Sequence, residues 1–390
     1  MKAMKTVQLS ELCDINPESI AKDYPYDFIE YIDISSVSSG HLAISPQLLS
    51  ISEAPSRAKR IVKNEDIIIS MVRPNLRSFM FITNPKENTI VSTGFAVLRT
   101  KPGIYPGFVY YAITDHKFTE YLANNAIGTS YPAVDTDTIL RGEIPNFSYD
   151  IQHKIASILS AYDSLIENNR RRIQLLEQSA RLLYREWFVH LRFPGHEHIR
   201  IIDGVPEGWK KRYLVDLADL VMGQSPKSEF YNEEGEGLPF HQGVTNFGDR
   251  FVNHEIYCTI KNRLANPGDI LCSVRAPVGR LNLTIDEIVI GRGLAAIHSK
   301  SNHQSFLYYQ LKNHFFKEDM IGGGAIFAAV TKKDMEKQEL LCPPHSLIID
   351  FEEISIPIDN QLRTLHLQNN RLRRARDILL PRLMNGEITV

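Results

Sequence analysis

No stretch of the sequence is apolar for about 18 residues, the length that a transmembrane helix needs. The first residues, MKAMKTVQLSELC, lack the apolar core of a secretory signal peptide. The four cysteines form no CxxC pair, so reduced thiols in a cytoplasmic protein are expected at Cys13, Cys258, Cys272 and Cys342. Neither sign of charge prevails, because 44 Lys and Arg against 46 Asp and Glu leave a net charge of −2. Net charge therefore argues neither for nor against binding to a polyanion.

The sequence also lacks the short motifs of common enzyme classes. There is no phosphate-binding GxxxxGK[ST] loop, no GxSxG elbow and no HExxH helix, and the Asn/Asp-Pro-Pro-aromatic tetrapeptide of amino-methyltransferases is missing. Gly322–Gly324 is interpreted as a flexible turn, and His196–His198, beside Pro194, as a solvated loop rather than a metal site. No acidic cluster typical of a nuclease is found. These absences argue against the common enzyme classes, and no residue is assigned to a catalytic or metal site.

An internal repeat with a period near 200 residues organises the chain. Hydrophobic residues make up 43% and charged residues 23%, and 390 residues predict two or three folded domains. Segments match in the same order along both halves: Leu9–Asp14 with Leu214–Asp219, Asp66–Ser70 with Asp269–Ser273, Phe108–Tyr111 with Phe306–Tyr309, and Ala133–Val134 with Ala329–Val330. Each copy mixes short strand-like runs with short helical segments, which is typical of a compact α/β domain.

A long amphipathic helix follows each globular part. Apolar residues recur at heptad spacing without interruption by Gly, and an Asn occupies one slot of each seam, where it costs stability but fixes register. The predicted seams are Ile155, Leu159, Tyr162, Ile166, Asn169, Ile173, Leu176, Leu183 and Trp187, then Leu362, Leu365, Asn369, Leu372 and Leu379. Arg376 occupies a further slot, and Pro357 fits a helix start or a kink. A helix over Ile155–Trp187 is about 50 Å long.

These patterns predict a mixed α/β fold. Two pseudo-repeated globular domains are expected to be separated by two long antiparallel helices that form a coiled-coil spacer. The expected boundaries are 1–150 for the first domain, 151–190 for the first helix, 191–345 for a linker and the second domain, and 346–390 for the second helix and the C-terminal tail.

Basic and hydrogen-bonding residues recur around corresponding strands of the two copies. Arginine suits contact with DNA, because its planar fork binds guanine bidentately or grips a phosphate. The candidate DNA-contacting residues are Arg57, Lys59, Arg60, Arg73, Asn75, Arg77, Thr129, Ser130 and Tyr131, then Lys261, Arg263, Arg275 and Arg280. For any one of them, an ordinary solvated loop residue is an equally simple interpretation.

Several segments resemble the DNA-specificity (S) subunit of type I restriction-modification enzymes. Ile144–Pro145 followed by Gln152, Ile155, Leu159 and Asp163, and then the seam, is similar to this family, as is the ending Arg374–Gly386. The resemblance covers essentially the whole chain. The second copy departs from it, because Asp350–Glu352 replaces the Gln-containing helix start.

The resemblance implies a non-catalytic recognition subunit. Each globular part would be a target-recognition domain that reads one half of a split, asymmetric sequence in double-stranded DNA. The helices would set the gap between the halves and dock two methyltransferase subunits, and motor-nuclease subunits could join them. S-adenosylmethionine, ATP and Mg would then be bound by those partners. No membrane is implied.

Two other functions stay open on the residues alone. The chain could be a coiled-coil adaptor that binds only proteins, in which case exchanging the Arg73 or Arg275 loop would leave DNA readout unchanged. It could also be a nuclease with an unfamiliar site, which metal-dependent cleavage by the purified chain would reveal.

Deleting or inserting one heptad in each long helix is expected to change the gap in the DNA target but not its half-sequences, because the helices act as the ruler between the domains. Methylation mapping with the shortened and lengthened variants measures this gap. An unchanged gap in both variants would contradict the hypothesis that the helices set it.

Overall fold

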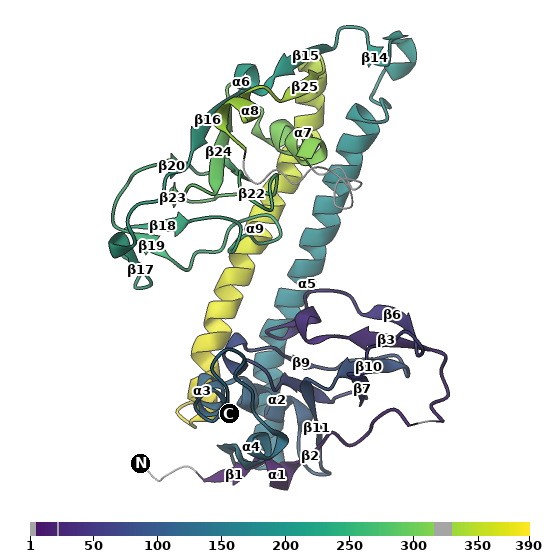
Figure 1. The fold of residues 1–390 in the computed structure, drawn as a ribbon, viewed down its shortest axis with the longest axis vertical. Coiled ribbons are helices and arrows are strands. Elements are labelled where there is room, and N and C mark those ends of the chain that lie inside the picture. Colours follow the sequence, from purple (N-terminus) through teal and green to yellow (C-terminus); the bar gives the residue numbers. More distant parts are fainter. Residues whose placement is uncertain (1–4, 22, 316–329) are drawn as a thin grey trace. The chain divides into compact units, whose positions relative to one another are not determined.

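The computed structural model describes residues 5–21, 23–315 and 330–390, so the turn predicted at Gly322–Gly324 and the repeat position Ala329 lie outside the described residues. The chain divides into two compact units, Met1–Glu167 with Asn370–Val390 (unit 1) and Asn168–Asn369 (unit 2). Two long helices, α5 (Tyr149–Phe188) and α9 (His345–Met384), contribute to both units (Figure 1). No helix within the described residues is long and apolar enough to cross a membrane.

Unit 1 is built on two four-stranded sheets and a terminal ribbon. The first sheet has the order β2-β11-β8-β9 and is antiparallel throughout, whereas the second, β6-β3-β10-β7, contains one parallel pair, β3 with β10. β1 pairs with β12, and β4 with β5. The strands are β1 (Thr6–Gln8), β2 (Cys13–Ile15), β3 (Phe28–Ile32), β4 (Val37–Ser38), β5 (His41–Leu42), β6 (Gln47–Ser50), β7 (Ala58–Ile61), β8 (Ile67–Ser70), β9 (Phe79–Phe81), β10 (Thr89–Ser92), β11 (Phe95–Thr100) and β12 (Glu143–Pro145). The helices are α1 (Leu9–Leu12), α2 (Pro106–Thr114), α3 (His116–Asn124) and α4 (Thr136–Arg141), with 3-10 turns η1 (Ile34–Ser36) and η2 (Pro74–Leu76).

Unit 2 repeats this plan. Its antiparallel sheet has the order β16-β24-β21-β22, and its second sheet, β17-β19-β18-β23-β20, again has one parallel pair, β18 with β23. β15 pairs with β25, as β1 does with β12, and β13 pairs with β14. The strands are β13 (Ile201–Ile202), β14 (Val205–Pro206), β15 (Lys210–Tyr213), β16 (Ala218–Met222), β17 (Tyr231–Asn232), β18 (Leu238–His241), β19 (Tyr257–Cys258), β20 (Leu264–Ala265), β21 (Ile270–Ser273), β22 (Leu281–Leu283), β23 (Ile288–Ile290), β24 (Leu294–Ser299) and β25 (Glu339–Cys342). The helices are α6 (Leu214–Leu217), α7 (Gln304–Phe315) and α8 (Lys332–Glu336), with 3-10 turns η3 (His196–His198) and η4 (Ser228–Phe230). The predicted mixed α/β fold with two repeated domains and two long helices is therefore confirmed.

The matched sequence segments occupy matched places in the two units. Asp66 and Asp269 are buried just before the central strands β8 and β21, and each accepts a hydrogen bond at 2.7 Å from the backbone N–H three residues earlier. The second tyrosine of each Phe-x-Tyr-Tyr segment donates a hydrogen bond to a carboxylate of a long helix. Tyr111 bonds Asp163 of α5 at 2.7 Å, and Tyr309 bonds Asp359 of α9 at 3.0 Å.

Within each unit the two long helices run antiparallel. In unit 2 the buried Asn169 donates to Asn369 at 3.0 Å, and further along α5 the Tyr184 ring meets Phe351 of α9. In unit 1 Asp163 pairs with Arg376, and Leu159 shares a core with Leu383. Every predicted seam residue is buried or partly buried. The polar seam positions thus face one another, as a register-fixing pair should.

Three details differ from simple expectations about the seam. Pro357 is no helix start, because α9 begins at His345 and Pro357 lies on its exposed side. Arg376 is tolerated in its seam slot because its guanidinium pairs with Asp163. The second copy has no Gln at its helix start, and Glu352 in the second turn of α9 provides the acceptor instead. Its carboxylate accepts the backbone N–H of Phe306, much as Gln152 accepts that of Tyr105.

Replacing one asparagine of the seam pair, as in Asn369→Leu, is expected to lower the free energy of unfolding by about 1–3 kcal/mol, because the Asn169 amide stays buried without its partner. The double variant Asn169→Leu/Asn369→Leu should recover most of that loss, since neither amide remains. Thermal unfolding of the three variants checks this, and equal losses in the single and double variants would contradict it.

Candidate nucleic-acid interface

Two candidate loops of unit 1 lie side by side. The chain leaves β8 into the turn η2, and Arg73 and Arg77 on either side of that turn have left-handed backbones with φ of 48° and 54°. Such a backbone costs a non-glycine residue about 1 kcal/mol, so the surroundings must hold it. Here the Arg73 N–H donates to the Pro132 carbonyl at 2.7 Å, and Val72 bridges Ala133. The sequence-distant loop 128–132 is thereby fixed beside Arg73.

The exposed side chains of these loops form one polar surface. The Arg73 guanidinium lies 4.3 Å from the centre of the Tyr131 ring and donates to the Ser130 carbonyl at 3.3 Å. Thr129, Ser130 and Tyr131 are all exposed. Arg57 is exposed nearby, paired with Asp33 at 3.2 Å, and hydrogen bonding to Tyr31 raises its pKa, with a smaller contribution from Tyr131. A cation stacked on an aromatic ring and flanked by hydroxyls suits contact with a nucleic acid.

Two candidate arginines of unit 1 turn their guanidinium groups towards the protein. Arg60 donates to the Thr93 carbonyl at 3.4 Å, and Arg77 donates to the Thr114 carbonyl at 2.6 Å and to the Thr119 hydroxyl at 3.1 Å. Burial lowers the pKa of both. Both side chains are thus partly buried, whereas Lys59 and Asn75 are exposed.

In unit 2 the corresponding loop carries Arg275, which is exposed after β21. Val274 beside it donates to the Gly293 carbonyl at 2.9 Å, just as Met71 donates to Gly94 in unit 1. The other candidates of this unit are also exposed: Lys261, Arg263 and Arg280. Lys261 pairs with Glu287 at 3.4 Å. The Arg73 and Arg275 loops thus stand at the same place in the two units.

A second polar group beside Arg275 was missed by the sequence reasoning. Arg292 is exposed in the turn between β23 and β24, and Gln242 is exposed where the chain leaves β18. Ser225 joins them, because its hydroxyl donates to Gln242 at 2.7 Å and accepts the Arg292 N–H at 3.2 Å. Gly293 permits this approach, since a Cβ there would lie 2.4 Å from the Gln242 carbonyl. The only sequence signal was an arginine between two glycines.

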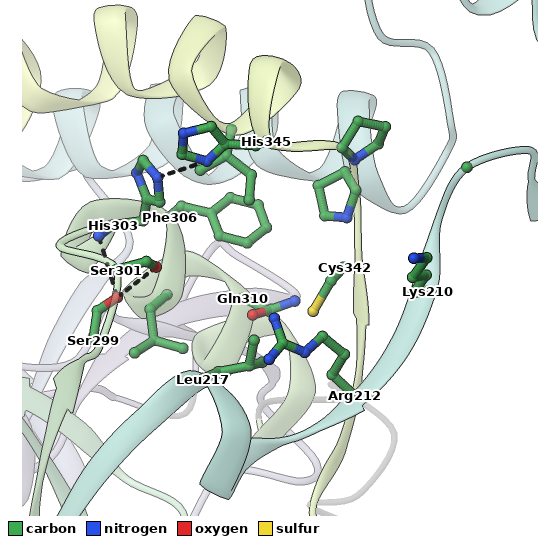
Figure 2. A pocket seen from close by; sticks show the side chains of 15 residues that line it. Lys210, Arg212, Leu217, Ser299, Ser301, His303, Phe306, Gln310, Cys342 and His345 are labelled. Atoms are coloured by element: carbon green, nitrogen blue, oxygen red, sulfur yellow. Dashed lines mark hydrogen bonds between the residues drawn. The ribbon is translucent and has the colours of Figure 1, made fainter.

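A cavity of about 340 Å³ opens elsewhere in unit 2, beside the start of α9 (Figure 2). Its polar lining includes Lys210, Arg212, His303 and His345, and its apolar floor includes Phe306. At the corresponding helix start of unit 1, aromatic rings pack edge to face instead: Tyr105, Tyr149 and His153. None of the candidate DNA-contacting residues lines the cavity.

No group of three His, Cys, Asp or Glu side chains within the described residues is close enough to hold a metal ion. The described His196–His198 segment forms the short turn η3 and has no buried residue. All four cysteines are free thiols, and burial raises the pKa of Cys13 and of Cys272 to about 12.

Comparison with known proteins gives the family of this arrangement. Residues 1–178 and 206–351 match the type I restriction modification DNA specificity domain. The chain is 31% identical, over 76% of its length and 72% of the relative's, to a Methanocaldococcus jannaschii protein whose name describes a type I restriction enzyme specificity subunit. The chain belongs to the type I restriction-modification DNA specificity family.

Further relatives agree with this assignment. The chain is 24% identical to the type I restriction enzyme HindI specificity subunit of Haemophilus influenzae, over 93% of this chain and 96% of that protein. The crystal structure of the type I restriction-modification system S subunit from M. genitalium covers 98% of this chain and 97% of its own, with a TM-score of 0.58 and 18% identity, which supports the fold. The family resemblance carried by Ile144–Pro145, the seam and the C-terminal ending is confirmed.

A buried histidine beside Gln242 of the second specificity domain is expected to make the free energy of unfolding depend on pH. Burial lowers the pKa of His241 to about 4, and its Nε2 lies 2.9 Å from Nδ1 of His254. Because the unfolded chain binds this proton near pH 6.5, acidification from pH 7 to pH 4 should cost up to about 3 kcal/mol at this residue. His241→Gln is expected to flatten the fall of the unfolding midpoint in that window. The exposed-residue control His198→Gln should keep the wild-type slope, and equal slopes in all three chains would contradict the assignment.

Proposed function

We propose that the chain is the non-catalytic DNA-specificity subunit of a type I restriction-modification complex, and that each globular domain reads one half of a split, asymmetric sequence in double-stranded DNA. One observation carries this proposal. Two copies of one fold present an exposed arginine, Arg73 or Arg275, on the loop that leaves the matching strand, β8 or β21. A DNA-binding loop that is repeated in two domains suits a target made of two half-sites.

The chemistry of the exposed residues supports direct contact with DNA. Arginine binds guanine O6 and N7 bidentately in the major groove, and hydroxyls and lysines position the phosphates. The proposed contact residues are Arg57, Lys59, Arg73, Asn75, Thr129, Ser130 and Tyr131 in the first domain and Lys261, Arg263, Arg275, Arg280, Gln242 and Arg292 in the second. Arg60 and Arg77 are proposed to support these loops from within.

The division of labour along the chain follows from the long helices. We propose that residues 1–150 and 191–345 hold the recognition domains, the latter with its linker. Residues 151–190 and 346–390 are then the spacer that sets the gap between the half-sites. Two domains on one spacer multiply discrimination, since each mismatched base pair costs roughly 1–3 kcal/mol.

The outer faces of the long helices support docking of methyltransferase subunits. Large apolar side chains at heptad-like intervals along α5 are half exposed, and a water-facing stripe of this kind is typical of a helix that awaits a partner helix. They are Ile158, Leu165, Leu175, Leu182 and Val189. In this proposal the partners bind S-adenosylmethionine, ATP and Mg, and the complex works on DNA in the cytoplasm, where the free thiols stay reduced.

Arg73→Ala is expected to weaken recognition of one half-site and Arg275→Ala that of the other, each by about 10–100-fold, because each removes one arginine contact. The measurement is binding of assembled complex, chain plus methyltransferase, to duplexes mutated in either half. Lys86→Ala serves as control. Lys86 is exposed and precedes β10, whereas Thr93, whose carbonyl accepts a hydrogen bond from Arg60, follows the other end of that strand.

Equal weakening for every duplex, with a shallower salt dependence, would reassign the arginine to a phosphate. Unchanged binding by both variants would contradict DNA contact at these loops and favour the protein-binding adaptor.

A further inference from the structure

The loop that leaves β18, residues 242–253 and here called the anchor loop, reaches from the polar group of unit 2 to the long helices. It begins at the exposed Gln242 and is closed at its base by the bond between His241 and His254. Asn282 holds its middle by donating to the Gly248 carbonyl at 2.7 Å. Near its end the ring of Phe251 packs against His366 of α9.

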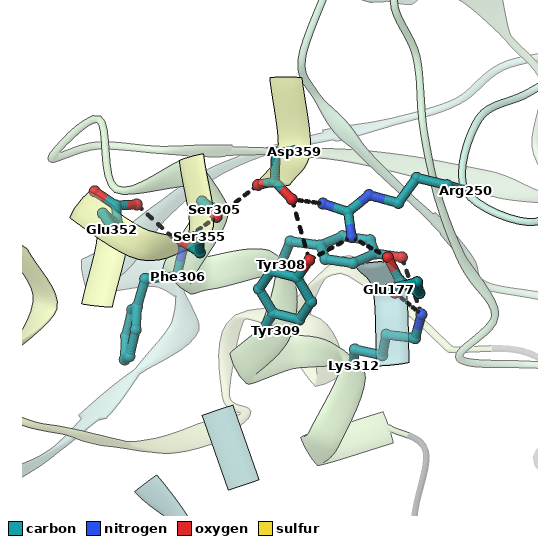
Figure 3. A network of polar contacts seen from close by, with 10 residues as sticks. All are labelled: Glu177, Arg250, Ser305, Phe306, Tyr308, Tyr309, Lys312, Glu352, Ser355 and Asp359. Atoms are coloured by element: carbon teal, nitrogen blue, oxygen red, sulfur yellow. Dashed lines mark hydrogen bonds and ion pairs between the residues drawn. The ribbon is translucent and has the colours of Figure 1, made fainter. Parts of the chain in front are cut away.

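Arg250 of the anchor loop joins both long helices at once (Figure 3). Its guanidinium pairs at 2.5 Å with Glu177 of α5 and at 2.5 Å with Asp359 of α9, and it lies 4.0 Å from the centre of the Tyr308 ring. Only 2% of its side chain is exposed. A fork of five donors can satisfy two carboxylates from different directions, which a lysine ammonium cannot do with the same geometry.

The charges around Arg250 are balanced within the buried cluster. Lys312 of α7 pairs with Glu177, and Ser305 donates to Asp359 at 2.6 Å. The pKa of Glu177 is lowered by the two cations against the opposing effect of burial. Two cations thus pair with two carboxylates. If the anchor loop moved away, it would remove Arg250 and leave Asp359 without its cation.

This cluster is a second attachment of the domain to the helices. The first is apolar, where Phe306 of α7 packs at 5.0 Å, ring centre to ring centre, on Phe188 of α5 within the core of unit 2. Apolar packing is non-directional and tolerates rocking, whereas a buried guanidinium between two fixed carboxylates defines direction. Two attachments at separate places restrict rotation that one would allow.

Unit 1 neutralises the corresponding carboxylate differently. Tyr111 and Asp163 repeat Tyr309 and Asp359, but the cation beside Asp163 is Arg376 of α9. There the ion pair joins helix to helix, and among the described residues no loop of the globular domain pairs with Asp163. The attachment through Arg250 is therefore a feature of the second domain.

We propose that Arg250 is a positioning residue that fixes the orientation of the second recognition domain on the helices and thereby makes the complex discriminate the length of the gap between half-sites. This inference rests on the proposed function. Loss of the Arg250 ion pairs should let the surface that contains Gln242 and Arg292 shift along the DNA, while the contact residues themselves stay unchanged.

The test compares assembled complexes of wild-type, Arg250→Lys and Glu177→Gln chains on duplexes with the native gap and with gaps one base pair shorter or longer. Methylation rates give a gap-selectivity ratio, and half-site mutants give sequence selectivity. Arg250→Lys is expected to lower gap selectivity by about tenfold, with a smaller fall for Glu177→Gln, because one or both directed contacts are lost. Both half-sequences should still be required.

Arg99→Lys is the matched control, because Arg99 pairs with the buried Asp66 and with Glu18 inside the sheets of unit 1. It should lower stability without changing gap selectivity. A uniform fall in rate with an unchanged gap ratio in both unit 2 variants would make the Arg250 cluster merely structural and overturn the inference. Absence of any split-site preference in the wild-type complex would instead overturn the proposed function.

Discussion

A hydrogen bond from a buried tyrosine to a carboxylate of a long helix joins each globular domain to its support. Tyr111 with Asp163 and Tyr309 with Asp359 are the two copies of this bond, and burial strongly raises the pKa of both tyrosines, so they remain donors. Both carboxylates are partly buried, and a nearby cation offsets the cost of removing their charge from water. Arg376 balances the first and Arg250 the second, so the same constraint has two different solutions in one chain.

The proposed DNA-contacting surfaces depend on rigid placement of loops that are distant in sequence. In unit 1 the left-handed backbone of Arg73 is held by the Pro132 carbonyl, and its guanidinium is stacked on Tyr131. In unit 2 Gly291 and Gly293 have no side chain, so the turn that carries Arg292 can pack directly against Gln242. Under the proposed function, loops held in this way present their donors to DNA with little conformational entropy left to lose. The same fold can therefore carry different contact residues in its two copies.

Periodicity made the long helices and their seams predictable, because a heptad pattern depends only on local spacing. It also placed Asn169 and Asn369 in the seam, although their contact needed the antiparallel pairing. The repeat predicted corresponding Arg73 and Arg275 loops. Sequence could not reveal that Arg60 and Arg77 turn inward, since their acceptors, Thr93 and Thr114, lie about 35 residues away along the chain. For the same reason it missed Arg292, and it gave no sign that Arg250 is buried between two helices. The parallel pairing of β3 with β10 was likewise beyond local patterns.

The central claim is that this chain chooses the DNA sequence on which its partners act. Methylome sequencing tests it most directly, in a host without systems of its own, with the neighbouring methyltransferase expressed alone or together with this chain. The account predicts a split methylated motif that appears only when the chain is present. Identical methylation in both strains, with the complex shown to assemble, would contradict it.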